Sequence, residues 1–222
     1  MSLVTFPSDI LKPNADRVWI DYRTRSGGET TAGRQQIVGS GVARWMMSLT
    51  FPLFTRETIL AFRAWLAQME GRANYTMIGP CDCSNGNSLI PAIHDIPYSD
   101  QSRHTDGAGF MQGGVPPYVS VPAAAGATQI TILNGSTALP VLAGSFMGVG
   151  GYFYVVVGAT PQPDETTILD IRPKLRAAVA ADAEVEWCDA RGPFRLLNDD
   201  SGVFDLQLGR YGTAVVDLVE FY

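Results

Sequence analysis

The sequence has little of the chemistry on which most enzymes depend. Its 222 residues include only 2 histidines and 3 cysteines, and 17% of them are charged. The 16 basic and 22 acidic side chains give a net charge of −6. A surface of this sign repels the phosphates of nucleic acids. The composition therefore argues against a protein that reads a nucleic-acid sequence.

Long apolar runs are also missing. No stretch approaches the length that crosses a bilayer, and the start MSLVTFPSDILKPN has no basic segment followed by a long apolar one. We expect no membrane partner, and a protein that stays in the cytosol or leaves it without such a signal. Three cysteines, two of them one residue apart, do not form a disulfide framework and favour a reduced compartment.

The pattern that is present is mainly β. Residues 17–22 (RVWIDY) and 41–51 (GVARWMMSLTF) alternate between two faces, which is typical of strands. The segment between them, residues 23–36, is polar and rich in glycine. It predicts a hairpin-like connection long enough to be ordered only by a partner.

One helix is expected over residues 55–70. Thr55 suits the N-cap, Glu57 places a carboxylate in the first turn, and Gly71 can provide a left-handed stop. The helix has an apolar stripe on one face, and such a stripe more often packs on a sheet than binds a cofactor. The stripe comprises Ile59, Phe62, Leu66 and Met69, widened by Trp65.

Residues 81–117 have no periodicity and are dense in Gly, Pro, Asn, Ser and Asp. A loop of this length inside a compact domain is usually disordered or functional. It keeps more apolar side chains than a solvated linker needs, which favours contact with neighbouring subunits. These side chains are Ile90, Ile93, Ile96, Tyr98, Phe110 and Met111.

A second β pattern interrupts the first. Between residues 121 and 186, short β-rich runs end in Gly or Pro punctuation, including QITIL before Asn134-Gly135, YFYVVV as a strand buried on both faces, and the run ending in AEVEW. After it, FRLL, GVFDLQL and TAVVDLVEFY resume strand patterning. We expect a β-sandwich or barrel scaffold of residues 1–117 and 191–222, with a small, closed or nearly closed β-barrel inserted at 118–190.

Candidate metal ligands are confined to the long loop. Cys81 and Cys83, with His94 and His104 downstream, form the only cluster. Structural zinc sites usually space paired cysteines by two to four residues, and a one-residue gap strains tetrahedral chelation. We therefore expect no metal and no cofactor.

Motifs for catalysis are missing as well. No Gly-x-Ser-x-Gly elbow occurs, and neither His94-Asp95 nor His104 with Asp106 is aimed at a nucleophile by adjacency alone. The glycines of SGGE and VGSG lack the Gly-Lys-Ser/Thr ending of a phosphate loop, and residues 198–202 favour a tight turn over a calcium site. We expect no catalytic residues and no enzymatic activity.

Three stretches of the chain resemble the distal tail proteins of long-tailed, siphovirus-like bacteriophages. The first is the strand-to-helix element RWMMSLTFPLFTRETILAFRAWLAQMEGRANYTMIGP. The second is the insert, with GATQITI, LAGSFMGVGG, YVVV and ILDIRPKLRAAVAADAEVEW followed by FRLL, and the third is the ending DLVEFY. Together they cover most of the chain from Arg44 onward.

The resemblance implies a structural virion protein. It implies a ring of six copies formed by contacts between sheet edges, an inserted barrel that faces outward, and a place at the tail tip after synthesis in the host bacterial cytoplasm. The implied partners are the tail tube protein, the tail-tip hub protein and fibres or receptor-binding proteins, with DNA passing through the lumen without specific binding. We expect the scaffold arginines to face interfaces or the exterior. They are Arg17, Arg23, Arg25, Arg34 and Arg44.

Three alternatives stay open. Another phage tail component, such as a hub, terminator or minor tail protein, uses the same building blocks. A carbohydrate-binding module on the tail tip would need exposed aromatic side chains, for which Tyr152, Tyr154 and Trp187 are candidates, although barrel core is the simpler reading of them. An enzyme is the third alternative and has the least support.

Overall fold

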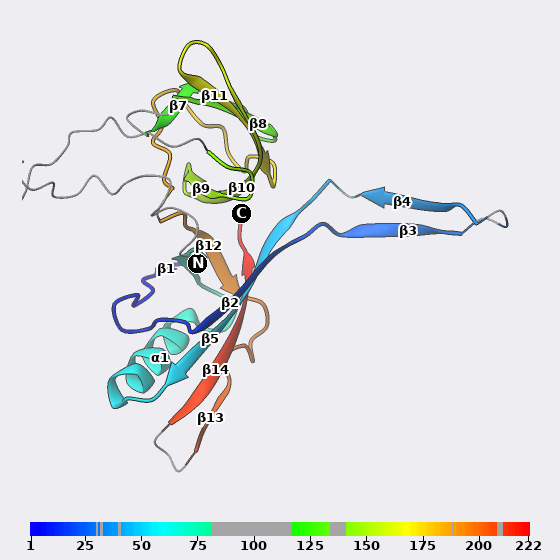
Figure 1. Cartoon of the computed structure of the whole chain (residues 1–222). Coiled ribbons are helices and arrows are strands. Elements are labelled where there is room, and N and C mark those ends of the chain that lie inside the picture. Colours follow the sequence, from blue (N-terminus) through cyan, green and yellow to red (C-terminus); the bar gives the residue numbers. More distant parts are fainter. Residues whose placement is uncertain are drawn as a thin grey trace, which may run out of the picture. The chain divides into compact units, whose positions relative to one another are not determined.

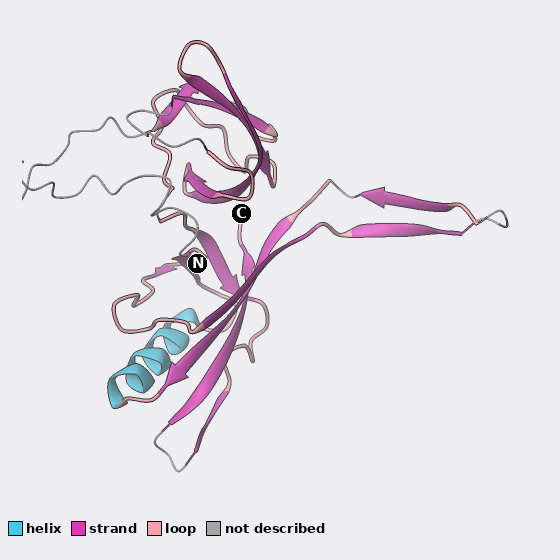
Figure 2. Cartoon of the chain, in the orientation of Figure 1, coloured by secondary structure: helices cyan, strands magenta, loops and turns pink. Residues whose placement is uncertain are grey.

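The computed structural model describes residues 1–29, 31, 33–39, 41–80, 117–133, 141–187, 189–207 and 211–222. The chain divides into two compact units, one of Met1–Cys81 with Gly192–Tyr222 and one of Asp82–Arg191. The fold is mainly β, with a single helix in the described residues (Figure 2). None of the described residues forms a helix long and apolar enough to span a bilayer.

The first unit carries the helix and most of the strands (Figure 1). Its elements are β1 (Leu3–Val4), β2 (Ala15–Asp21), β3 (Thr24–Glu29), β4 (Gln35–Gly39), β5 (Arg44–Leu53), α1 (Arg56–Met69), β6 (Tyr75–Ile78), β12 (Gly192–Leu196), β13 (Phe204–Gln207) and β14 (Tyr211–Glu220). The second unit contains β7 (Tyr118–Val121), β8 (Gln129–Leu133), β9 (Phe146–Val149), β10 (Tyr152–Pro161) and β11 (Thr166–Arg172).

Segments from both sides of the second unit build one sheet. Its seven strands follow the order β1-β6-β12-β14-β5-β2, and β13 also pairs with β14. The chain leaves this sheet after β6 and returns as β12, which pairs with β6 so that Phe194 lies opposite Thr76. The last strand, β14, then runs antiparallel to β5 in the middle of the sheet. The expected alternation of β5 is present, since Trp45, Met47 and Leu49 are all buried.

Helix α1 covers the face of the sheet that carries these buried side chains. Thr55 is the N-cap, as expected, and forms a capping box with Thr58: each side-chain oxygen accepts a hydrogen bond from the other residue's backbone N–H, at 3.1 and 3.2 Å. The helix ends at Met69, and Glu70 and Gly71 both adopt left-handed backbone conformations. This arrangement satisfies carbonyl groups at the helix end.

The apolar stripe of the helix differs from the expected one at a single position. Ile59, Phe62, Trp65 and Met69 are buried, whereas Leu66 is only half-buried. The ring of Phe62 lies 5.7 Å from that of Phe51 on β5 and 5.9 Å from that of Trp65. An indole has more surface to bury than a leucine, so Trp65 takes the central place facing the sheet.

The second unit is a curled antiparallel sheet in the order β7-β8-β11-β10-β9, which forms a half-barrel. Its two edge strands are joined by an irregular segment, residues 182–186. On one side the Val119 N–H donates to the carbonyl oxygen of Ala183 at 2.9 Å, and on the other Gly148 and Glu186 exchange backbone hydrogen bonds at 2.7 and 2.9 Å. The sheet is therefore a half-barrel whose two edges are linked through residues 182–186 only by isolated bridges, and full closure of the barrel stays a prediction.

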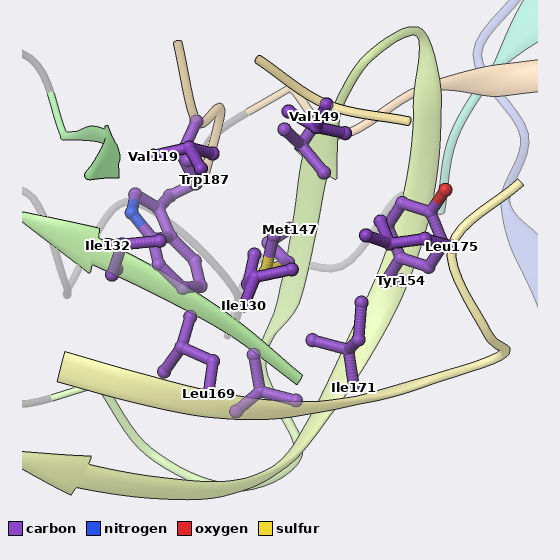
Figure 3. Packing of buried hydrophobic residues seen from close by; sticks show 13 residues of the cluster. Val119, Ile130, Ile132, Met147, Val149, Tyr154, Leu169, Ile171, Leu175 and Trp187 are labelled. Atoms are coloured by element: carbon purple, nitrogen blue, oxygen red, sulfur yellow. The ribbon is translucent and has the colours of Figure 1, made fainter. Parts of the chain in front are cut away.

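The core of the second unit is one cluster of buried apolar side chains (Figure 3). It comprises Val119, Ile130, Ile132, Met147, Val149, Tyr154, Val156, Leu169, Ile171, Leu175, Val179, Val185 and Trp187. The second unit's sheet includes residues before 121, because β7 starts at Tyr118 and pairs with β8. Val119 on β7 is part of this buried cluster. The expectation that YFYVVV is buried on both faces is wrong at its end, where Val157 is 48% exposed. The predicted Asn134-Gly135 turn lies outside the described residues.

Candidate assembly surfaces

Strands β3 and β4 form a separate two-stranded hairpin, residues 24–39, which we call the arm. The β2–β5 ladder ends where Asp21 lies opposite Arg44, and the arm ladder begins where Thr24 lies opposite Gly39. The arm therefore continues the same pair of strands past a short interruption, at which Arg23 has a φ of 46° (Figure 1). The polar segment predicted as a hairpin-like connection is thus itself β-structure.

None of the arm residues that the structure describes is buried. Every residue of β3 and β4 is exposed, including the apolar Ile37 and Val38 at 63% and 55%. A two-stranded hairpin without a packed face is marginally stable in water. Among the strands that the structure describes, none pairs with either outer edge of the arm. These features are typical of a segment that contacts another chain.

The two faces of the arm differ in charge. Ile37 lies opposite Ser26, and two residues along β4 Gln35 lies opposite Glu29, so these four residues share one face. Val38 lies opposite Arg25 on the other face. The Ile37 face thus carries one apolar side chain beside one carboxylate, whereas the Val38 face carries a guanidinium.

An apolar hollow of about 240 Å³ lies at the end of β5 that is remote from the arm. Its floor includes the buried Leu11 and Phe51, and its rim includes Ile10 and Phe54, which are 37% and 67% exposed. Lys12 is the one charged residue in the lining. The hollow is smaller than the roughly 300 Å³ at which small-molecule pockets begin, so side chains of a partner suit it better than a metabolite.

The face of the large sheet opposite α1 mixes polar and apolar rows. Arg17, Ser48 and Asp217 lie in one row across β2, β5 and β14. The neighbouring row contains Met46 beside Trp19, whose side chain is 39% exposed. Strand β2 ends the sheet order, so its outer edge has backbone groups that no further strand of this sheet covers.

The acidic stretch at residues 198–202 is a turn, as predicted. The Ser201 N–H donates to the carbonyl oxygen of Asn198, and Asp199 Oδ1 accepts from the Arg72 N–H at 3.1 Å. The carboxylate therefore ties this turn to the end of α1. Within the described ranges, no group of three or more His, Cys, Asp and Glu side chains could hold a metal ion. Cys81, Cys83, His94 and His104 lie outside those ranges, so the absence of a metal there stays a prediction.

The aromatic candidates for sugar stacking belong mostly to the core of the half-barrel. Tyr154 and Trp187 are 1% and 3% exposed and lie in the buried cluster (Figure 3). The Tyr154 hydroxyl oxygen accepts a hydrogen bond from the Arg176 N–H at 3.0 Å. Tyr152 is half-buried and packs against the same cluster. A stacking platform needs an exposed ring face, which Tyr154 and Trp187 lack.

The scaffold arginines lie along β2, the arm and the start of β5. Four of them are exposed and Arg44 is half-buried. Arg23 forms an ion pair with Asp21 at 3.4 Å. The exposed four are Arg17, Arg23, Arg25 and Arg34. Solvent-accessible guanidinium groups can pair with carboxylates of a neighbouring subunit.

Two carboxyl groups in the second unit are perturbed by their surroundings, in opposite directions. Desolvation raises the pKa of Glu186, and the nearby Asp189 and Glu184 raise it further, while Arg191 lowers it. The residue stays largely exposed, so solvent screens these effects. In contrast, the pKa of Asp164 is lowered, because the Thr166 hydroxyl donates a hydrogen bond to Asp164 Oδ1 at 2.7 Å.

Sequence reasoning missed the apolar hollow. Its rim residues Ile10 and Phe54 lie outside the two alternating strands, one before β2 and one just after β5. The available signal was an Ile-Leu pair next to Lys12 and Pro13 in a segment without periodicity. That signal does not show which distant residues will meet it.

No protein-family model matches the chain, and the search of curated proteins gave no match either.

Proposed function

We propose that this protein is a structural component of a bacteriophage tail, which forms a homomeric ring at the distal end and joins the tail tube to the tail-tip hub and fibres. The observation that carries the proposal is the arm. A hairpin whose strands β3 and β4 have no buried residue, attached to a sheet with open edges, suits a subunit whose stability is completed by its neighbours. The resemblance to distal tail proteins supplies the setting, with six as the expected number of copies.

The remaining features are compatible with this role. The large sheet has one face covered by α1, and on its other face Trp19 is 39% exposed. The net charge of −6 suits a channel through which DNA passes without being retained. Another tail component, such as a hub or minor tail protein, is the alternative role. The burial of Tyr154 and Trp187 disfavours a sugar-binding module.

Native mass spectrometry and negative-stain imaging of the purified chain test the proposal. We expect a closed ring with a central lumen and a single copy number near six. A strict monomer at high protein concentration, or an open filament without closure, would contradict it. A closed ring with a different copy number would retain the ring but favour another position in the tail.

A further inference from the structure

We infer that the arm of one copy of this chain docks into the apolar hollow of the next copy, with Ile37 as the anchor and Glu29 beside Lys12. This inference rests on the ring proposed above and names the contact that would build it. Both elements are in place on each copy. One supplies an apolar side chain exposed to water, and the other supplies an apolar recess with an exposed rim.

The chemistry selects one face of the arm. The hollow is apolar with a single cation, Lys12, in its lining. The face that carries Ile37 also carries the carboxylate of Glu29, whereas the Val38 face carries Arg25. Docking through the Val38 face would bring Arg25 toward Lys12, and like charges brought together weaken binding. The Ile37 face instead places opposite charges together around an apolar contact.

The position of the hollow makes docking within one copy difficult. Strand β5 has 10 residues and is about 30 Å long. The arm joins it at Arg44, and the rim residue Phe54 follows its other end. The arm ladder continues the β2–β5 ladder past Arg44, in the direction away from Phe51 and Phe54. Ile37 therefore lies far from the hollow of its own copy, and a second copy provides the hollow.

This geometry also determines the type of assembly. Because the arm and the hollow lie at opposite ends of the β2–β5 pair, each copy offers one of each to different neighbours. Such an interface is heterologous, and it generates a ring when its rotation closes. The same contact explains why every residue of β3 and β4 is exposed in a single copy.

Two neighbouring substitutions on opposite faces form a matched test. Ile37→Ser and Val38→Ser each remove a branched apolar side chain that is more than half exposed in the single copy, so neither should change the melting temperature of the monomer. We expect Ile37→Ser to weaken self-association by about tenfold or more, in line with losing one buried aliphatic side chain. Val38→Ser should leave association unchanged. Equal effects of both variants, or no effect of Ile37→Ser, would overturn the docking.

A charge exchange tests the second part of the contact. Glu29→Lys and Lys12→Glu should each weaken association, and the two together should restore it at least in part. Sedimentation velocity over a concentration series measures all of these variants. Failure of the double variant to recover beyond either single one would contradict the proximity of Glu29 and Lys12.

Crosslinking separates this inference from the ring itself. With Cys81, Cys83 and Cys188 replaced by serine, Ile37→Cys protein is mixed with Phe54→Cys protein under oxidation, and Val203→Cys serves as the control partner. A disulfide-linked dimer from the first mixture only is the expected result. If the wild type forms rings but this dimer is missing, the docking is wrong and the ring stands. If the wild type is monomeric, the ring fails, and the presence or absence of the dimer still decides the docking.

Discussion

Replacing Gly71 with alanine should destabilise the first unit through two separable effects. Gly71 has a φ of 61°, and a Cβ there would lie 2.7 Å from Asp199 Oδ1 and 3.2 Å from its Cγ. A left-handed conformation costs a residue with a Cβ about 1–2 kcal/mol. Asp199 must also move, which weakens its bond to the Arg72 N–H, a further cost of about 1 kcal/mol for an exposed pair. We expect a total loss of about 2–3 kcal/mol.

Urea denaturation of four proteins measures both effects: wild type, Gly71→Ala, Asp199→Ala and the double variant. Without the carboxylate, Gly71→Ala should cost only the backbone part, about 1–2 kcal/mol. Gly41→Ala is the matched control, since Gly41 has a φ of 68° and no atom within 4 Å of the added Cβ. An identical cost of Gly71→Ala in both backgrounds would refute the clash with Asp199. A total below about 0.5 kcal/mol would refute the whole argument.

Three further outcomes follow from the packing and the charges. Phe62 is fully buried, so Phe62→Ala should lower the free energy of unfolding by about 3–5 kcal/mol in urea denaturation. An effect below about 1 kcal/mol would show that Phe62 is not in the core. Glu186→Gln should raise the melting temperature at pH 7 but not at pH 4. The pKa of Glu186 is raised in the folded state, so the protein loses stability as the pH rises from the unfolded pKa of about 4.5 through the folded pKa. A gain of the same size at both pH values would contradict this. Replacing residues 118–190 with a short Gly/Ser linker should leave a soluble, cooperatively melting first unit, since β12 and β14 pair with β6 and β5; an insoluble product would show that the two units share one core.

Local patterns predicted the elements that local chemistry determines. The alternation in β5, the N-cap at Thr55 and the turn at residues 198–202 each depend on neighbours a few residues away, and each is present. The return of the chain to complete the first sheet was also visible, because strand patterning resumes after the insert. These features need no knowledge of distant contacts.

Features that depend on distant contacts were mispredicted or missed. The segment ending in AEVEW has the composition of a strand, yet residues 182–186 must bond to β7 on one side and Gly148 on the other, which leaves no regular ladder. Leu66, which was expected in the buried stripe, is only half-buried, whereas Trp65 packs against Phe51 on β5. The apolar hollow joins Ile10 to Phe54 across the sheet edge, and no local pattern pairs them.

The most direct test of the central claim is a cryo-electron microscopy map of a virion that carries this protein. We expect a single closed ring of this chain at the distal end of the tail tube, around an open lumen, with the arm of each copy reaching the next copy. Finding the chain elsewhere in the particle, or in the particle without a ring around the lumen, would contradict the account.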